Sequence, residues 1–89
     1  MNYEKEVDKL LRNGSLVHLL SGLSAETGEV CALFQKAAYK GNLHINRNDL
    51  KLELGDVLFY VTAIANLFEL SLDEIKKANI NKLHMRNLK

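Results

Sequence analysis

The chain has 89 residues, of which 47% are hydrophobic and 26% are charged, and its net charge is +1. This length predicts a single domain over residues 1–89, and the composition excludes a disordered chain. The net charge of +1 gives no indication of a nucleic-acid or membrane partner, and we expect neither.

The first residues and the cysteine content indicate the cytoplasm. Residues 1–6 lack the hydrophobic region of a signal peptide, and no run of about 18 apolar residues could span a membrane. The single cysteine, Cys31, excludes an intramolecular disulfide and fits a reducing compartment. Because Cys31 lies in an apolar helical stretch, we expect it to fill space in the core.

The absence of proline and the spacing of apolar residues predict helices throughout. A short helix is expected over residues 3–12, ending at an Asn-Gly pair. Ser15 can cap a second helix, which runs from residue 16 to residue 39 or 40 and stops at a Gly-Asn pair.

Residues 41–48 are predicted to form a loop, and a third helix follows over residues 48–69. Ser71 and Glu74 then form a capping box that opens a fourth helix. The side of the fourth helix that we expect to be buried carries Leu72, Ile75, Ala78, Leu83 and Leu88.

The two long helices predict an antiparallel hairpin, and the whole chain an all-α four-helix bundle. The third helix is apolar on nearly every side and must therefore be covered on every side. Because 89 residues supply too little cover, we expect oligomerisation to complete the bundle, as a homodimer or a homotetramer. The alternative is a tightly packed monomer.

A short acidic phrase occurs twice, at residues 26–30 (ETGEV) and 53–57 (ELGDV). Each copy places two carboxylates three positions apart on one side of a helix, within an apolar stripe. The four carboxylates that can converge across a hairpin are Glu26, Glu29, Glu53 and Asp56. Such a group needs a positive charge, and oxygen ligands suit Mg²⁺ or Mn²⁺. Alternatively, these acids are solvated or form structural salt bridges.

Each acidic phrase also contains a glycine in the middle of a helix, Gly28 or Gly55. A glycine there costs about 1 kcal/mol relative to alanine. We therefore expect both glycines to permit a close approach between helices.

Residues 22–30 (GLSAETGEV) and 52–60 (LELGDVLFY) resemble the MazG-like family of all-α nucleoside triphosphate pyrophosphohydrolases, in particular its short phage and bacterial members. The resemblance spans about residues 16–86. It implies Mg²⁺-dependent hydrolysis of (deoxy)nucleoside triphosphates to the monophosphate and pyrophosphate, in the cleansing of nucleotide pools. It also implies that the same four acids bind the metal.

The chain departs from the family pattern at Ala25, where many members carry the first glutamate of a Glu-Glu-x-x-Glu motif. Activation of water must then fall to one of the four acids. We favour Glu29, at the edge of the stripe, with Glu26 as the other candidate. Shorter phage-type members also have a single glutamate before x-x-Glu, so Ala25 does not exclude activity.

Cationic side chains are expected to hold the phosphates of the substrate. Lys36 lies ten residues after Glu26, towards the same flank as Glu29, and Lys40 lies at the helix end. The resemblance further implies substrate contacts from Asn79, Lys82 and Arg86. Alternatively, the C-terminal cations complement the dipole of their helix.

Tyr60 lies one turn beyond Asp56. It either contacts the base or sugar, as the resemblance implies, or packs in the core with its hydroxyl bonded. His44, in the loop, is a candidate lid residue over the base. Two other functions stay open: a non-catalytic helical module that binds a structural ion and regulates a partner, and a pyrophosphatase acting on phosphoribosyl-ATP.

Overall fold

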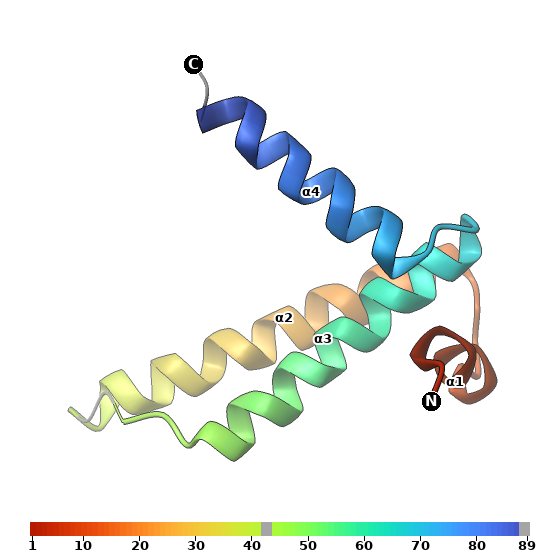
Figure 1. Ribbon diagram of the computed structural model, residues 1–89. Coiled ribbons are helices and arrows are strands. Elements are labelled where there is room, and N and C mark those ends of the chain that lie inside the picture. Colours follow the sequence, from red (N-terminus) through yellow and green to blue (C-terminus); the bar gives the residue numbers. More distant parts are fainter. Residues whose placement is uncertain (42–43, 88–89) are drawn as a thin grey trace.

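The computed structural model describes residues 1–41 and 44–87, and this part of the chain forms four helices without strands (Figure 1). The helices are α1 (Tyr3–Leu10), α2 (Leu16–Tyr39), α3 (Arg47–Leu67) and α4 (Leu72–Asn87). The all-α prediction is confirmed. Helices α1 and α3 each end two residues earlier than expected. The predicted loop residues 42–43 and the predicted buried residue Leu88 lie outside the described residues.

Polar side chains cap the start of each helix, as the local sequence indicates. The residues that act as caps are Asn2, Ser15, Asn46 and Ser71. The capping box is confirmed: the Glu74 amide donates to Ser71 Oγ at 3.1 Å, and the Ser71 amide donates to Glu74 Oε2 at 2.7 Å. Local hydrogen bonding therefore sets where the helices begin.

Helices α2 and α3 pack side by side as an antiparallel hairpin (Figure 1). Helix α1 packs against α3 at the open end of the hairpin, which is the end away from the loop between α2 and α3. The buried core cluster consists of Val7, Leu19 and Ala63. The partly buried side chains packed against it are Tyr3, Leu11, Phe59, Tyr60 and Ile64. The core thus lies at the end of the hairpin away from the connecting loop, where three helices meet.

Gly22 leaves room on α2 for the Tyr60 ring of α3. A Cβ atom at this position would overlap the Tyr60 ring, lying 2.7 Å from Cδ1 and closer still to Cε1 and Cζ. At Gly28 or Gly55, by contrast, a Cβ atom would meet nothing within 4 Å. The prediction for these two glycines was therefore wrong within this chain. Gly28 lies about 200° round the helix from Glu26, on the side facing away from the hairpin partner.

Helix α4 turns away from the hairpin instead of packing on it (Figure 1). The bend between α3 and α4 is 102°, and Glu69 between them has a φ of 57°. Consequently Ala78 and Leu83 are exposed and α4 contains no fully buried residue, contrary to prediction. The four-helix bundle is not closed within one chain.

Helix α1 holds the first residue of α4 in place. The amide of Leu72 donates to the Glu4 carboxylate at 3.3 Å, and Asn66 Nδ2 donates to the Glu4 carbonyl oxygen at 2.9 Å. One residue of α1 therefore bonds to both the end of α3 and the start of α4, which fixes the direction in which α4 leaves.

Cys31 is exposed, so the prediction that it fills the core was wrong. Its position about 140° from Glu26 places it on the outer face of α2, away from α3.

In the described part of the chain, no single helix is long and apolar enough to cross a membrane. Helices α3 and α4 meet that length and composition only as a bent pair.

Candidate functional site

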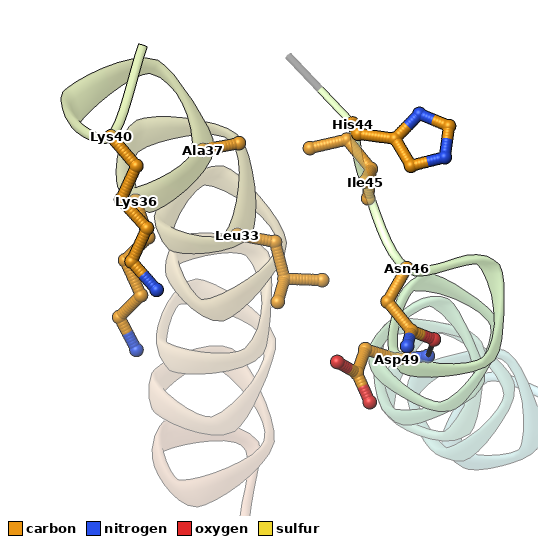
Figure 2. A pocket seen from close by; sticks show the side chains of 8 residues that line it. All are labelled: Leu33, Lys36, Ala37, Lys40, His44, Ile45, Asn46 and Asp49. Atoms are coloured by element: carbon orange, nitrogen blue, oxygen red, sulfur yellow. Dashed lines mark hydrogen bonds between the residues drawn. The ribbon is translucent and has the colours of Figure 1, made fainter. Parts of the chain in front are cut away.

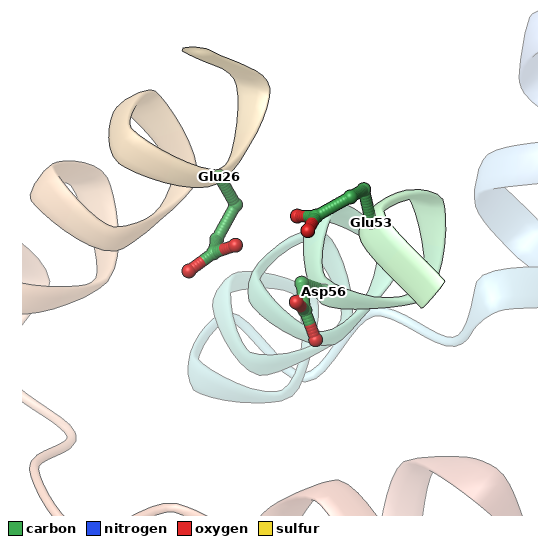
Figure 3. Close-up of side chains that lie close together, drawn as sticks. All are labelled: Glu26, Glu53 and Asp56. Carbon is green, nitrogen blue, oxygen red and sulfur yellow. The ribbon is translucent and has the colours of Figure 1, made fainter. Parts of the chain in front are cut away.

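Three carboxylates from both helices of the hairpin converge (Figure 3). Glu26 extends from α2 towards Glu53 and Asp56 of α3, and one oxygen from each lies within 4.8 Å of the others. Glu53 and Asp56 share a side of α3 because they are three residues apart. The two acidic phrases thus lie level, as predicted. We call these three residues the acidic cluster.

Glu29 is not one of the carboxylates that meet in the acidic cluster. It lies one turn after Glu26 on α2 and is exposed. Its charge nevertheless contributes to raising the pKa of Glu26. Of the four acids predicted to converge, the structure therefore gathers three and leaves Glu29 at the edge nearer the hairpin loop.

The pKa of Glu26 is raised above the ordinary carboxyl value of 4.5. Burial is the largest cause, followed by the negative charges of Asp56, Glu53 and Glu29 and a hydrogen bond with Asp56. Like charges at this distance disfavour ionisation unless a cation lies among them. Because every donor is a carboxylate oxygen, the cluster fits a hard divalent cation such as Mg²⁺ or Mn²⁺.

An aromatic wall adjoins the acidic cluster. A pocket of about 300 Å³ is lined by Glu26, Asp56, Phe59 and Tyr60, and we call it the aromatic pocket. The Tyr60 ring meets Phe59 edge to face, with centroids 5.4 Å apart, and lies 6.3 Å from the His18 ring. Tyr60 therefore lies beside the acids and also packs against the core.

Sequence reasoning missed two residues beside the site, Gly22 and Tyr3. Gly22 lies four residues before Glu26, and Tyr60 lies four residues after Asp56. In an antiparallel hairpin with the acids level, Gly22 therefore lies opposite Tyr60, and this spacing could have predicted their contact. Tyr3 packs on the core, and burial together with the charge of Asp56 raises its pKa. The local pattern of α1 carried no signal for this, because the position of α1 depends on long-range packing.

A second pocket, of about 280 Å³, lies at the loop end of the hairpin, and we call it the lysine pocket (Figure 2). Lys36 and Lys40 of α2 and Asp49 of α3 contribute its charged groups, and Leu33 contributes to its apolar wall. His44 also lines it, although in Figure 2 its ring points away from α2. The structure therefore places Lys36 beyond the acids, towards the loop.

The remaining predicted substrate contacts lie on α4. All three are exposed on a helix that extends away from the hairpin (Figure 1): Asn79, Lys82 and Arg86. The structure therefore does not bring them to the acidic cluster of their own chain.

Comparison with known proteins places the chain in a family. The family model described as the MazG nucleotide pyrophosphohydrolase domain matches residues 15–89. The Gene 37 protein of Mycobacterium phage L5 is 36% identical over 74 residues, which cover 80% of this chain and 65% of that protein. The chain thus spans about two thirds of the length of this relative. No solved structure matches the chain. Since the family model covers everything from the cap of α2 onwards, the chain belongs to the MazG nucleotide pyrophosphohydrolase family.

Proposed function

We propose that the protein hydrolyses (deoxy)nucleoside triphosphates between the α and β phosphates, with Mg²⁺ as the cofactor and Mn²⁺ as a possible substitute. The products are a nucleoside monophosphate and pyrophosphate, which suits a role in cleansing nucleotide pools. The single observation that carries the proposal is the convergence of Glu26, Glu53 and Asp56 to within 4.8 Å. Family membership supplies the reaction class.

In this proposal the three residues of the acidic cluster hold the ion, and Glu29 is the general base. An ion held by these residues would neutralise the triphosphate oxygens and lower the pKa of a water molecule. Glu29 accepts a proton from the water as the water oxygen bonds to the α-phosphorus, the bond from that phosphorus to the bridging oxygen breaks, and pyrophosphate leaves. Glu29 suits the role of base because it lies one turn from Glu26, is exposed, and has no share in the cluster. Glu26 is the other candidate.

We also propose that the active protein is a homo-oligomer. The chain exposes 7250 Å², whereas a folded monomer of its 10.1 kDa exposes about 5,300 Å². Its radius of gyration is 15.7 Å, against about 12 Å for a globular chain of this length. The excess area of about 2,000 Å² lies within the range of about 1,000–2,500 Å² that one subunit buries in an obligate dimer.

An apolar side of the hairpin supports association. Leu20 and Phe34 of α2 are 50% and 48% exposed, and Leu54 and Leu58 of α3 are 49% and 44% exposed. Measured from Glu26 on α2 and from Glu53 on α3, all four side chains lie about 80–140° round the helix in the same rotational sense. Because the helices are antiparallel, these positions share one side of the hairpin. A homodimer covers this side, and a homotetramer is the alternative.

An oligomer also gives α4 a role. Its residues Asn79, Lys82 and Arg86 lie away from the acids of their own chain, and in an oligomer they can reach the substrate of a second copy. Tyr60, in the aromatic pocket, is the proposed contact to the base or sugar. Nucleic acid and membranes have no part in this proposal.

The test is to incubate the protein with Mg²⁺ and each common triphosphate, and with phosphoribosyl-ATP, and to follow the products by phosphorus NMR. We expect pyrophosphate from the wild type and from Glu69→Gln, an exposed acid outside the acidic cluster. We expect none from Glu53→Gln. Orthophosphate alone would show a different phosphatase reaction, and no product from any nucleotide would contradict enzymatic function.

A further inference from the structure

A pocket of about 280 Å³ lies at the open end of the hairpin, and we call it the open-end pocket. Its apolar wall includes Leu11 and Leu67, and its charged groups are the carboxylates of Asp8 on α1 and Glu69 after α3. Its described lining contains no cation, and within residues 1–41 and 44–87 neither acid forms an ion pair. The open-end pocket therefore combines an apolar wall with two negative charges that have no cation beside them.

Helix α4 carries a surface of the opposite charge. Ile80 is 51% exposed, and Lys76 and Lys77 precede it by four and three residues, so the three side chains share one side of the helix. We call them the α4 patch. No acid occurs in residues 75–87. Lys76 pairs with the exposed Asp73 at 3.9 Å, and such an exposed pair contributes little to stability. The α4 patch is thus an exposed apolar side chain flanked by two cations.

The α4 patch and the open-end pocket do not meet within one chain. Helix α4 extends away from the hairpin, and among the described residues no ion pair joins the two surfaces (Figure 1). They nevertheless lie near each other, because Glu69 lies in the bend before α4 and Ile80 is only eight residues, or about 12 Å, beyond the first residue of α4. A two-fold axis between them would bring each surface to the opposite surface of a second copy, and such reciprocal contacts close.

We infer that two copies of the chain bind each other reciprocally, with the α4 patch of each copy seated in the open-end pocket of the other. Ile80 then packs on the apolar wall, and the two ammonium groups beside it face the two carboxylates of the pocket. Burial of apolar surface supplies the attraction, and the opposite charges select which surfaces pair. The contact also covers α4, which contains no buried residue within its own chain. The inference rests on the proposed homo-oligomer, for which it names a second contact, and is independent of catalysis.

This contact leaves the other association surface and the proposed substrate contacts free. Leu67 lies within about 40° of Glu53 round α3, whereas Leu58, on the apolar side of the hairpin, lies about 140° from it. Each copy can therefore bind one partner through the apolar side and another through α4, which gives a homotetramer with two kinds of interface. The proposed substrate contacts on α4 lie about 100–160° round the helix from Ile80: Asn79, Lys82 and Arg86.

The test is analytical ultracentrifugation of charge-reversed variants at low and high salt. The variants are Lys76→Glu/Lys77→Glu, Asp8→Lys/Glu69→Lys, and a matched control at the loop end, Lys36→Glu/Lys40→Glu. We expect a tetramer from the wild type and the control. In each of the first two variants the tetramer should dissociate to dimers at least about thirtyfold more readily, because like charges then face each other. High salt should weaken the wild-type contact by screening.

Mixing the two reversed variants separates charge pairing from general damage. In a one-to-one mixture, each α4 patch again finds a pocket of opposite charge on the other variant, so the tetramer should return. Circular dichroism checks that each variant retains its helices. A monomeric wild type, an unchanged mass in both reversed variants, or a mixture that stays dissociated would each overturn the inference.

The same experiment separates this contact from the rest of the proposed function. A wild-type dimer that both reversals convert to monomers, and that mixing restores, would support this contact and refute only the association through the apolar side of the hairpin. Because no measurement involves a nucleotide, a failure of the proposed hydrolysis would leave the contact between copies unaffected.

Discussion

Replacing Gly22 with alanine tests how closely α2 and α3 approach each other beside the acidic cluster. The new methyl group would lie within 2.7 Å of three carbons of the Tyr60 ring. The ring cannot move freely, because it packs on the buried core and its centroid lies 5.4 Å from that of Phe59. The helices must separate or the ring must leave its place next to Glu26.

The expected net effect is a loss of about 1–2 kcal/mol in the free energy of unfolding. Alanine favours a helix over glycine by about 1 kcal/mol. Overpacking a core costs about 1–3 kcal/mol, and three clashing ring carbons put this site at the upper end. For a chain of this size, a loss of 1 kcal/mol lowers Tm by about 4–8 °C.

The assay is urea unfolding followed by circular dichroism at one fixed protein concentration. Gly28→Ala is the matched control, since it lies on the same helix with nothing within 4 Å of the new methyl group. It should stabilise the protein by about 1 kcal/mol. In a Tyr60→Leu background, Gly22→Ala should no longer destabilise. Equal stability of Gly22→Ala and Gly28→Ala would refute the close approach.

Three further predictions concern the acids and the helix caps. The first is a pH dependence. Because the pKa of Glu26 is raised on folding, the unfolded chain releases this proton first as the pH rises from about 4.5, so the stability of the metal-free protein should fall until the folded pKa is passed. Glu26→Gln should flatten this dependence in denaturant titrations with a chelator, and a metal-free stability that rises through this window in the wild type but not in the variant would reverse the sign of the argument. Second, Glu53→Gln should abolish turnover and weaken Mg²⁺ binding, yet raise Tm in chelator because one of three crowded charges is removed; calorimetry and thermal melts check this, and full activity would remove Glu53 from the site. Third, Ser71→Ala should cost about 1 kcal/mol by removing the cap that accepts from the Glu74 amide; an unchanged urea midpoint would show that this hydrogen bond contributes nothing.

Local signals were enough to predict most of the helix boundaries and the level position of two acid pairs. Caps such as Ser15 and Ser71 act over three residues and are therefore visible in sequence. Acids at a spacing of three share one side of a helix, and two such pairs on the helices of one hairpin can face each other. Glu26, Glu53 and Asp56 could be placed together for this reason.

Long-range packing could not be predicted in the same way. The turn at Glu69, with its positive φ, directs α4 away from the hairpin, and nothing in the pattern around this residue marks that conformation. The position of Tyr3 depends on where α1 docks. Gly28 and Gly55 repeat within the acidic phrases, yet a Cβ atom at either would meet nothing within 4 Å, whereas Gly22, outside the repeat, lies against the Tyr60 ring.

The small core has a consequence for how the protein behaves on dilution. Leu19 and Val7 are the largest apolar side chains that are fully buried in the described part of the chain. So little enclosed hydrocarbon cannot offset the entropy of ordering four helices, and we expect the rest to come from contact between copies. Halving the concentration of the chain would then remove more than half of the folded, assembled protein.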